Sequence, residues 1–373
     1  MNEVRIGLIG CGGMGRSHLA AIKDLDRVRL TAASDNFEAN RNIVRDEYDV
    51  PVFEDGHDLI KSGEVDAVLI ATPHYFHPVY TIAALDAGLH ALSEKPVSVT
   101  AGAAQDMNDA AARHPDLKFA VMFQMRTNPM WRKMRELITT GVLGDIRRIH
   151  WTATNWFRTQ AYYNSGGWRA TWAGEGGGVL LNQCPHNIDL LYWLCGLPKR
   201  ITAAVSLGKY HDIEVEDDVT AILEYENGAT GVFIAATGES PGTSFFEIVG
   251  SKGKATLAAG GNQRIELTTV IDGDIDTFCR TTDSRWGSPP FMQSQIDVGA
   301  GGSHKVIHEN FVNAILDGEA LIAPGIEGIH SVEMANAMIY AGLRNTPVDL
   351  PMDRDAYDVL LKELIDEAAK AKK

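Results

Sequence analysis

The fold is decided by the stretch Val4-Arg5-Ile6-Gly7-Leu8-Ile9-Gly10-Cys11-Gly12-Gly13-Met14-Gly15. Its apolar first half predicts a short buried strand, and a helical pattern follows the glycines through residue 23. The loop between them has the spacing G-x-G-x-x-G. In such a loop the first glycine permits a tight turn, the second lets a pyrophosphate approach the backbone, and the third lets helix and strand pack closely. The stretch therefore predicts a dinucleotide-binding unit made by residues 10–15.

A second predicted strand, residues 28–33, ends close to Asp35, which lies twenty residues after Gly15. A carboxylate at this place accepts a hydrogen bond from the ribose 2′-hydroxyl and repels a 2′-phosphate. The alternative is an aspartate that opens a surface turn. We expect the ribose role, and hence NAD in preference to NADP, although the neighbouring Arg41 keeps NADP open.

Strands and helices go on alternating through residue 123. Strands are predicted at 65–71, 89–93 and 118–123, and helices at 76–87 and 101–113. This alternation predicts a parallel, doubly wound sheet of the α/β class. Ligands of such sheets bind beyond the carboxyl ends of the strands. The residues expected at those ends, and hence at the cofactor, are Thr72, Pro73, His74, Glu94, Lys95 and Gln124.

Lys95 carries the most specific prediction in this half. It ends a buried strand and precedes a proline, which favours an extended backbone. A lysine that points into the cofactor crevice donates a hydrogen bond to a substrate hydroxyl and polarises the developing carbonyl. The alternative is a solvated lysine paired with Glu94, and the predicted crevice favours the catalytic role.

A second glycine-rich stretch runs from Glu175 through Gly176-Gly177-Gly178 to Asp189. The helix that it predicts begins either after the glycines or at Pro185, because proline breaks a helix interior but suits its first turn. Asn182, His186 and Asp189 recur at helical spacing and are expected to share one polar face. Either His186 is a buried core histidine, or it serves a site, and the predicted cofactor site favours the second.

Taken together, the motifs resemble the glucose–fructose oxidoreductase/inositol dehydrogenase (Gfo/Idh/MocA) family. The resemblance covers essentially the whole chain and rests on residues 10–15, 72–77, 94–96 and 176–189. It implies that Lys95 lies beside nicotinamide and substrate, that His186 is the acid/base and that His77 joins the cofactor site. Two positions depart from the common pattern. Many members have Asn at position 74, where this chain has His, and polyol-oxidising members often have Asp at position 182, where it has Asn.

The alternation ends near residue 144. Strand-like runs follow at 145–157, 200–207, 219–225, 230–237, 244–249 and 255–258, and residues 226–228 predict a hairpin turn. We therefore expect an α+β domain on a large, mostly antiparallel sheet, with helices at 305–316, 327–343 and 353–371. The predicted division is a Rossmann domain (1–125), a substrate-binding and oligomerisation domain (126–350) and a C-terminal helix (351–373). The resemblance implies a homodimer or homotetramer that forms through this second sheet.

Aromatic, arginine and amide side chains crowd residues 156–172 without a clear period. Aromatic faces stack on the C–H faces of a sugar ring, while polar side chains bind its hydroxyls. The alternative is a packed loop with surface arginines. We favour a sugar-binding wall, whose predicted residues are Arg126, Trp156, Arg158, Tyr163, Trp168, Arg169, Asn182 and Asp189.

Composition excludes several classes of protein. The chain has 373 residues and 34 basic against 49 acidic side chains, a net charge of −15 that argues against nucleic-acid or anionic-membrane binding. Four scattered cysteines indicate neither a zinc ribbon nor a disulfide framework, so we expect no metal and a reducing compartment. With no signal peptide and no apolar run of membrane-spanning length expected, the predicted location is the cytoplasm.

The sequence thus predicts an NAD(P)-dependent dehydrogenase that oxidises a secondary hydroxyl of a sugar, glycoside or cyclitol. His186 would take the hydroxyl proton and Lys95 would stabilise the forming charge. One alternative is a redox-neutral enzyme with tightly held NAD, acting as a glycosidase through transient oxidation or as an aldose–aldose oxidoreductase. Another is a nucleotide-sensing regulator without turnover.

Overall fold

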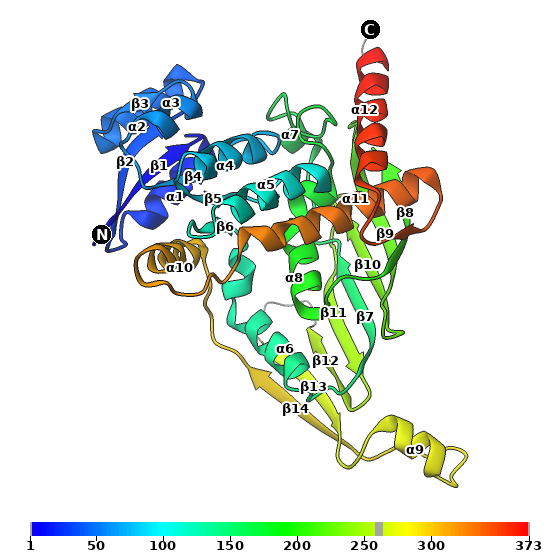
Figure 1. Cartoon of the computed structure of the whole chain (residues 1–373). Helices are drawn as coiled ribbons and strands as arrows, with labels where there is room; N and C mark the ends of the chain where they lie inside the picture. Colours follow the sequence, from blue (N-terminus) through cyan, green and yellow to red (C-terminus); the bar gives the residue numbers. More distant parts are fainter. Residues whose placement is uncertain (1, 258–263, 372–373) are drawn as a thin grey trace.

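The computed structural model describes residues 2–257 and 264–371, which form two sheets with helices packed around them (Figure 1). Position 258 of the predicted strand 255–258 and positions 372 and 373 of the predicted C-terminal helix lie outside the described residues.

The first sheet has six strands in the order β3-β2-β1-β4-β5-β6, and all neighbouring strands run parallel. Its strands are β1 (Val4–Ile9), β2 (Val28–Ser34), β3 (Val52–Phe53), β4 (Ala67–Ile70), β5 (His90–Ser93) and β6 (Phe119–Val121). Its helices are α1 (Gly13–Ile22), α2 (Glu38–Tyr48), α3 (Gly56–Lys61), α4 (Phe76–Asp86) and α5 (Ala101–Arg113). The predicted doubly wound parallel sheet is confirmed, with the strand order of a dinucleotide-binding fold.

The second sheet has nine strands in the order β14-β13-β12-β11-β7-β10-β9-β8-β15. β7 and β10 pair in parallel, whereas the other described neighbours pair antiparallel. The strands are β7 (Ile146–Ala153), β8 (Arg200–Leu207), β9 (Glu216–Glu224), β10 (Thr230–Ala236), β11 (Ser244–Gly250), β12 (Gly253–Leu257), β13 (Arg264–Val270), β14 (Phe291–Asp297) and β15 (Val348–Asp349). This sheet and its helices confirm the predicted α+β second half.

The remaining helical segments lie between and after these strands. They are η1 (Gln124–Thr127), α6 (Pro129–Thr139), α7 (Gln160–Tyr163), the π-helical turn η2 (Val179–Gln183), α8 (Pro185–Cys195), α9 (Ile275–Thr281), α10 (His304–Asp317), η3 (Gly325–Glu327), α11 (Gly328–Arg344) and α12 (Arg354–Ala371).

Two predicted elements differ from the structure. The strand predicted at 145–157 ends at Ala153, because β10 and β11 pair with β7 only that far. The predicted helix does not start at the glycines: η2 comes first, and α8 begins at Pro185, in the first-turn position that tolerates proline.

Each sheet has its own hydrophobic core, and the chain returns to the first core near its end. Ile307, Phe311 and Val312 of α10 are buried against the first sheet, although they follow β14 of the second sheet in sequence. Helix α12 buries Tyr357 and Leu361 in the second core, and α11 lies beside α5 across the junction (Figure 1). The predicted division into three domains stays a prediction, but neither α10 nor α12 packs as a separate unit.

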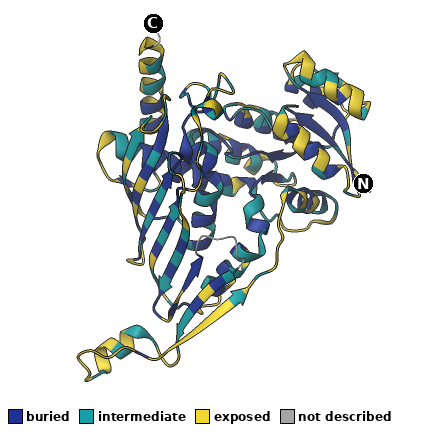
Figure 2. Cartoon of the chain, turned by 180° about the vertical axis from the view of Figure 1, so that it is seen from behind, coloured by how far each residue is buried: buried dark blue, intermediate teal, exposed yellow. Residues whose placement is uncertain are grey.

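An arm extends from the far end of the second sheet. Helix α9, all of whose residues are described, has no buried residue, and β14 is almost wholly exposed (Figure 2). The prediction that copies of the chain associate through this sheet stays a prediction. Of the helices within the described ranges, none combines the length and the apolar character that a bilayer crossing requires.

Candidate active site

A cavity of about 650 Å³ reaches from the glycine loop of the first domain to η2 of the second. Of the residues predicted for the site, fourteen line it: Gly10, Gly12, Gly13, Met14, Asp35, Thr72, Pro73, His74, His77, Glu94, Lys95, Trp168, Arg169 and Asn182. The cavity therefore joins the predicted cofactor residues to part of the predicted substrate wall.

The glycine loop has open space on one side and close packing on the other. A Cβ added to Gly12 or Gly13 would have no described atom within 4 Å, so both positions face free space in the cavity. A Cβ on Gly15 would lie 2.0 Å from the carbonyl oxygen of Gly10, so the third glycine is required for packing. Gly12 is also the N-cap of α1, whose first N–H groups can bind an anion. The loop fits the pyrophosphate of a dinucleotide.

Asp35 lies just beyond β2, with its carboxylate held by the protein. Oδ2 accepts hydrogen bonds from the Cys11 N–H (2.8 Å) and the Asn40 side chain (3.1 Å), and Oδ1 accepts from the Phe37 N–H (2.8 Å). Arg41 is held at 2.7 Å by the carbonyl oxygen of Asp35, and it is not among the described residues that line the cavity. The charge beside the predicted ribose position is therefore the carboxylate.

Lys95 reaches across the cavity to the second domain. Its Nζ donates a hydrogen bond of 3.1 Å to the carbonyl oxygen of Asn182. Burial lowers the pKa of Lys95, against the opposing charges of Glu94 and Glu175. Burial would raise the pKa of Glu94, but the hydrogen bond from His18 (2.8 Å) and the charges of His18 and Lys95 outweigh it and lower that pKa to about 2. Lys95 thus lies two residues beyond β5, where the charges of two carboxylates act on it.

The wall opposite the glycine loop is a hydrogen-bonded network. The Asn182 side chain donates from Nδ2 to Glu175 Oε1, and its Oδ1 accepts from the Tyr162 hydroxyl at 3.4 Å. Arg169 Nη1 donates to the same hydroxyl at 2.9 Å, and its guanidinium lies over the rings of Tyr162 and Trp168. Hydrogen-bond donors and aromatic faces therefore meet at one end of the cavity.

The predicted shared face of Asn182, His186 and Asp189 does not form. Asn182 belongs to η2 and lines the cavity, while the other two belong to α8 and are not among the described lining residues. The cause is the π-helical turn before Pro185, which has a wider winding than an α-helix and so breaks the 3.6-residue period. Glu216 supports the turn, since its Oε1 accepts from the N–H groups of Gly178 (2.8 Å) and Leu180 (3.1 Å).

His186 lies close to Lys95 but is not among the described residues that line the cavity. Its Nε2 lies 3.1 Å from Nε2 of Gln124, and its ring meets the Phe123 ring edge-on. Within the described residues, Nδ1 of His186 and Oε1 of Gln124 have no hydrogen-bond partner. Burial, and after it the charge of Lys95, lowers the pKa of His186 to about 3. The imidazole is therefore neutral at physiological pH.

Several residues predicted for the substrate wall lie away from the cavity. Arg126 is buried in an ion pair with Asp189 (2.6 Å) and also bonds Glu327, so both predicted polar groups are already satisfied inside the protein. The Tyr163 hydroxyl donates to Thr237 at 2.9 Å in the core. The described lining also leaves out Trp156, which bonds Asn187, together with Arg158, Gly15 and Gln124.

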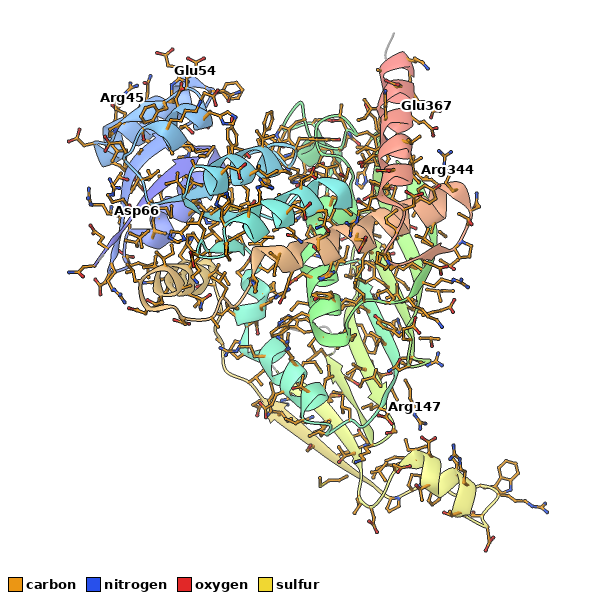
Figure 3. All side chains as sticks on the ribbon, in the orientation of Figure 1. Arg45, Glu54, Asp66, Arg147, Arg344 and Glu367 are labelled. Atoms are coloured by element: carbon orange, nitrogen blue, oxygen red, sulfur yellow. The ribbon has the colours of Figure 1, made fainter. Side chains whose placement is uncertain are left out.

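Other lining residues were not among the predicted contacts. Phe37, which is 67% exposed, lines the outer end with Asn40, Glu54 and Tyr80, and Glu54 lies at the outer edge of the first domain (Figure 3). The signal in the sequence that could have found Phe37 is an aromatic residue two positions after the ribose aspartate. At the inner end the lining residue is Tyr162, whereas the wall prediction chose its neighbour Tyr163, because the two side chains are the same and no period separates them.

Metal binding has no support in the described part of the chain, where no three His, Cys, Asp or Glu side chains gather in a suitable cluster. All four cysteines are free.

Known proteins share both sequence and fold with this chain. The rhizopine catabolism protein MocA of Rhizobium meliloti is 30% identical over 68% of this chain and 78% of its own length. Levoglucosan dehydrogenase of Pseudarthrobacter phenanthrenivorans is 24% identical over 94% of this chain and 99% of its own. The WlbA dehydrogenase of Bordetella pertussis, solved in complex with NADH and UDP-GlcNAcA, superposes with a TM-score of 0.79 at 25% identity over 94% of this chain and 100% of its own.

Both halves of the chain also match family descriptions. Residues 4–123 match the oxidoreductase family with an NAD-binding Rossmann fold, and residues 131–256 match the GFO/IDH/MocA C-terminal domain. These matches confirm the resemblance that the motifs carry and the prediction of an oxidoreductase. The chain belongs to the Gfo/Idh/MocA family of NAD(P)-binding oxidoreductases, homologous to NAD-dependent dehydrogenases that act on CH–OH groups.

Proposed function

We propose that the protein is an NAD-dependent dehydrogenase that oxidises a secondary hydroxyl of a sugar, glycoside or cyclitol. The observation that carries the proposal is the single cavity that runs from Gly12 past Lys95 to Asn182, Trp168 and Arg169. A dinucleotide laid on the glycine loop would end beside Lys95, and the polar and aromatic wall beyond it suits a ring rich in hydroxyls. The names of the relatives, which include a levoglucosan dehydrogenase and a dehydrogenase bound to a nucleotide sugar, agree with this substrate class.

Bound NAD would supply the hydride acceptor, and the chain's own groups would handle the proton. Lys95 Nζ would donate a hydrogen bond to the substrate oxygen and stabilise the charge that forms there. His186 would take the hydroxyl proton at Nδ1, the ring nitrogen without a partner among the described residues. With the Gln124 amide in its opposite orientation, Oε1 would accept from Nε2–H of His186 and leave Nδ1 as the acceptor.

The direct test is NADH formation, followed by absorbance at 340 nm, against a panel of pyranoses, glycosides and cyclitols with NAD or NADP. The proposal expects turnover with at least one member of the panel. Turnover without net NADH, with cofactor that co-purifies and resists dialysis, would instead favour the redox-neutral alternative. No turnover with any compound would contradict the proposal and favour a nucleotide-sensing protein.

Cofactor choice is expected to follow the carboxylate of Asp35. The wild type should bind NAD at least about tenfold more tightly than NADP, or ~1.4 kcal/mol, because the carboxylate repels a 2′-phosphate. Asp35→Ser should reduce the ratio of the NADP dissociation constant to the NAD dissociation constant. Calorimetry with both cofactors would measure this ratio in the wild type and in the variant.

The matched control for Asp35→Ser is Asp55→Ser. Asp55 caps α3 by accepting from the His57 N–H at 2.9 Å, a comparable structural task outside the described cavity lining. It should leave the ratio unchanged. Equal affinity of the wild type for the two cofactors would contradict the role of Asp35.

A further inference from the structure

Glu175 is a buried carboxylate that ties together the two segments of the substrate wall. It is 1% exposed and precedes the three glycines. Its Oε2 accepts a hydrogen bond from the Ala170 N–H at 2.7 Å, and its Oε1 accepts from Asn182 Nδ2. One acid therefore holds both the loop that carries Arg169 and the π-helical turn that carries Asn182.

Both contacts act on parts of the wall that need support. Ala170 has a φ of +54°, in the left-handed region that costs a non-glycine residue about 1–2 kcal/mol, so its N–H bond to Glu175 helps to hold the turn after Arg169. At the other end, Glu175 accepts from Nδ2 of Asn182, which orients the amide so that Oδ1 accepts from the Tyr162 hydroxyl. The acid thereby sets which atoms the wall presents to the cavity.

Glu175 also places a negative charge near two cations. Arg169 Nη1 lies 4.0 Å from Glu175 Oε1, and Lys95 bonds the carbonyl of the same Asn182 whose side chain bonds Glu175. Burial raises the pKa of Glu175, whereas the Ala170 N–H, Asn182, Arg169 and Lys95 act against that rise. The other charged or titratable groups around Lys95 are Glu94, Cys184, Arg169, His74, His77, His186 and His304.

We propose that Glu175 is a positioning residue of the active site, which clamps Arg169 and Asn182 in place and supplies the counter-charge that keeps Lys95 a protonated hydrogen-bond donor. This rests on the proposed function for its meaning in catalysis. It accounts for a chain in which the residue at position 182 cannot ionise, because the carboxylate on this side of the cavity is Glu175, which bonds the side chain of Asn182.

The test compares three variants in the NAD-loaded protein. Glu175→Gln removes the charge and nearly keeps the shape. Glu216→Gln is the matched control, since Glu216 is equally buried and bonds the same glycine-rich segment through Gly178 and Leu180. The exchange variant Glu175→Gln/Asn182→Asp keeps both the hydrogen bond and the total charge, with donor and acceptor reversed.

The first readout is the titration of Lys95, followed by NMR after ¹³C-dimethylation of the lysines and assigned with Lys95→Arg. Lys95 should titrate at lower pH in Glu175→Gln than in the wild type, because an attractive charge has been lost. It should titrate as in the wild type in Glu216→Gln, and close to it in the exchange variant. With a substrate found in the panel, kcat of Glu175→Gln should fall about 10- to 100-fold, while NAD affinity is kept.

An unchanged Lys95 titration in Glu175→Gln, or an equal change in Glu216→Gln, would overturn the proposal. If Glu175→Gln does not fold, the exchange variant decides: a folded protein with wild-type titration supports the proposal, and failure of that variant too would reduce Glu175 to a structural role. The titration needs no substrate, so its outcome is independent of whether the sugar panel supports the proposed function.

Discussion

Replacing His186 by alanine is expected to lower kcat for oxidation by about 10²–10⁴-fold while the dissociation constant of NAD stays near that of the wild type. The imidazole lies close to Lys95 and 3.1 Å from the Gln124 amide, and it is not part of the glycine loop. Its loss would remove the proton acceptor and leave the nucleotide end intact. Single-turnover NADH formation and calorimetry measure the two effects separately.

The pH dependence follows from the protonation of His186 and Lys95, because burial lowers the pKa of both side chains. His186 accepts a proton only when it is neutral. Burial and the charge of Lys95 lower its pKa to about 3, so its deprotonation should raise the oxidation rate only as the pH rises through about 3. Lys95 donates only when protonated, and burial lowers its pKa, so the rate should fall at alkaline pH earlier than for an exposed lysine. Between pH 5 and 8 the wild-type rate should change little on account of His186.

Lys95→Ala should reduce kcat and also raise KM, because its hydrogen bond exists with bound substrate as well as in the transition state. The double variant with His186→Ala should lose less than the sum of the two effects, since both residues act on one hydroxyl. Lys61→Ala, at the exposed end of α3, is the control for loss of a lysine. Near-wild-type turnover in His186→Ala would move the acceptor to Tyr162, whose ring lines the cavity, and Tyr162→Phe would then be the inactive variant.

Gly12→Val is expected to abolish NAD binding without unfolding the protein. A Cβ at this position meets no described atom within 4 Å, so the branched side chain would fill the space that a pyrophosphate needs and would not strain the fold. The dissociation constant of NAD should rise at least about 100-fold, or ~2.8 kcal/mol. Valine is a poor N-cap for α1, which should cost about 1 kcal/mol and a few degrees of Tm.

Two other glycine variants serve as controls for Gly12→Val. Gly15→Val should destabilise the protein itself, because its Cβ would lie 2.0 Å from a backbone oxygen. Gly299→Val, at an exposed glycine with no described atom near its Cβ, should change neither stability nor binding. Wild-type affinity for NAD in Gly12→Val, measured by calorimetry, would place the nucleotide site elsewhere.

The first domain could be predicted because its signals are local. The apolar run of β1, the glycine spacing and the carboxylate of Asp35 each have a physical reason within a few residues, and the alternation that follows determines a parallel sheet. The return of α10 to the first core could not be predicted. Phe311 looks like any core residue of an amphipathic helix, and only the fold decides which core it enters.

The site was predicted only in part, because the fold, and not the local sequence, decides where several of its side chains point. Trp168 and Arg169 line the cavity as expected, but Tyr163 points into the core while Tyr162 faces the cavity, a difference of direction within one short helix, α7. Arg126 was expected at the wall and is buried against Asp189, because a buried ion pair and a substrate-binding pair have the same composition. The π-helical turn has no local signature except the position of Pro185.

The most direct test of the central claim, hydride transfer from a sugar carbon to NAD in this cavity, uses a substrate from the panel deuterated at the carbon that is oxidised. Mass spectrometry of the reduced cofactor should show one deuterium per NADH formed. The single-turnover rate should be slower than with the undeuterated sugar. Reduced cofactor without the label, or no reduced cofactor from any sugar or cyclitol, would contradict the account.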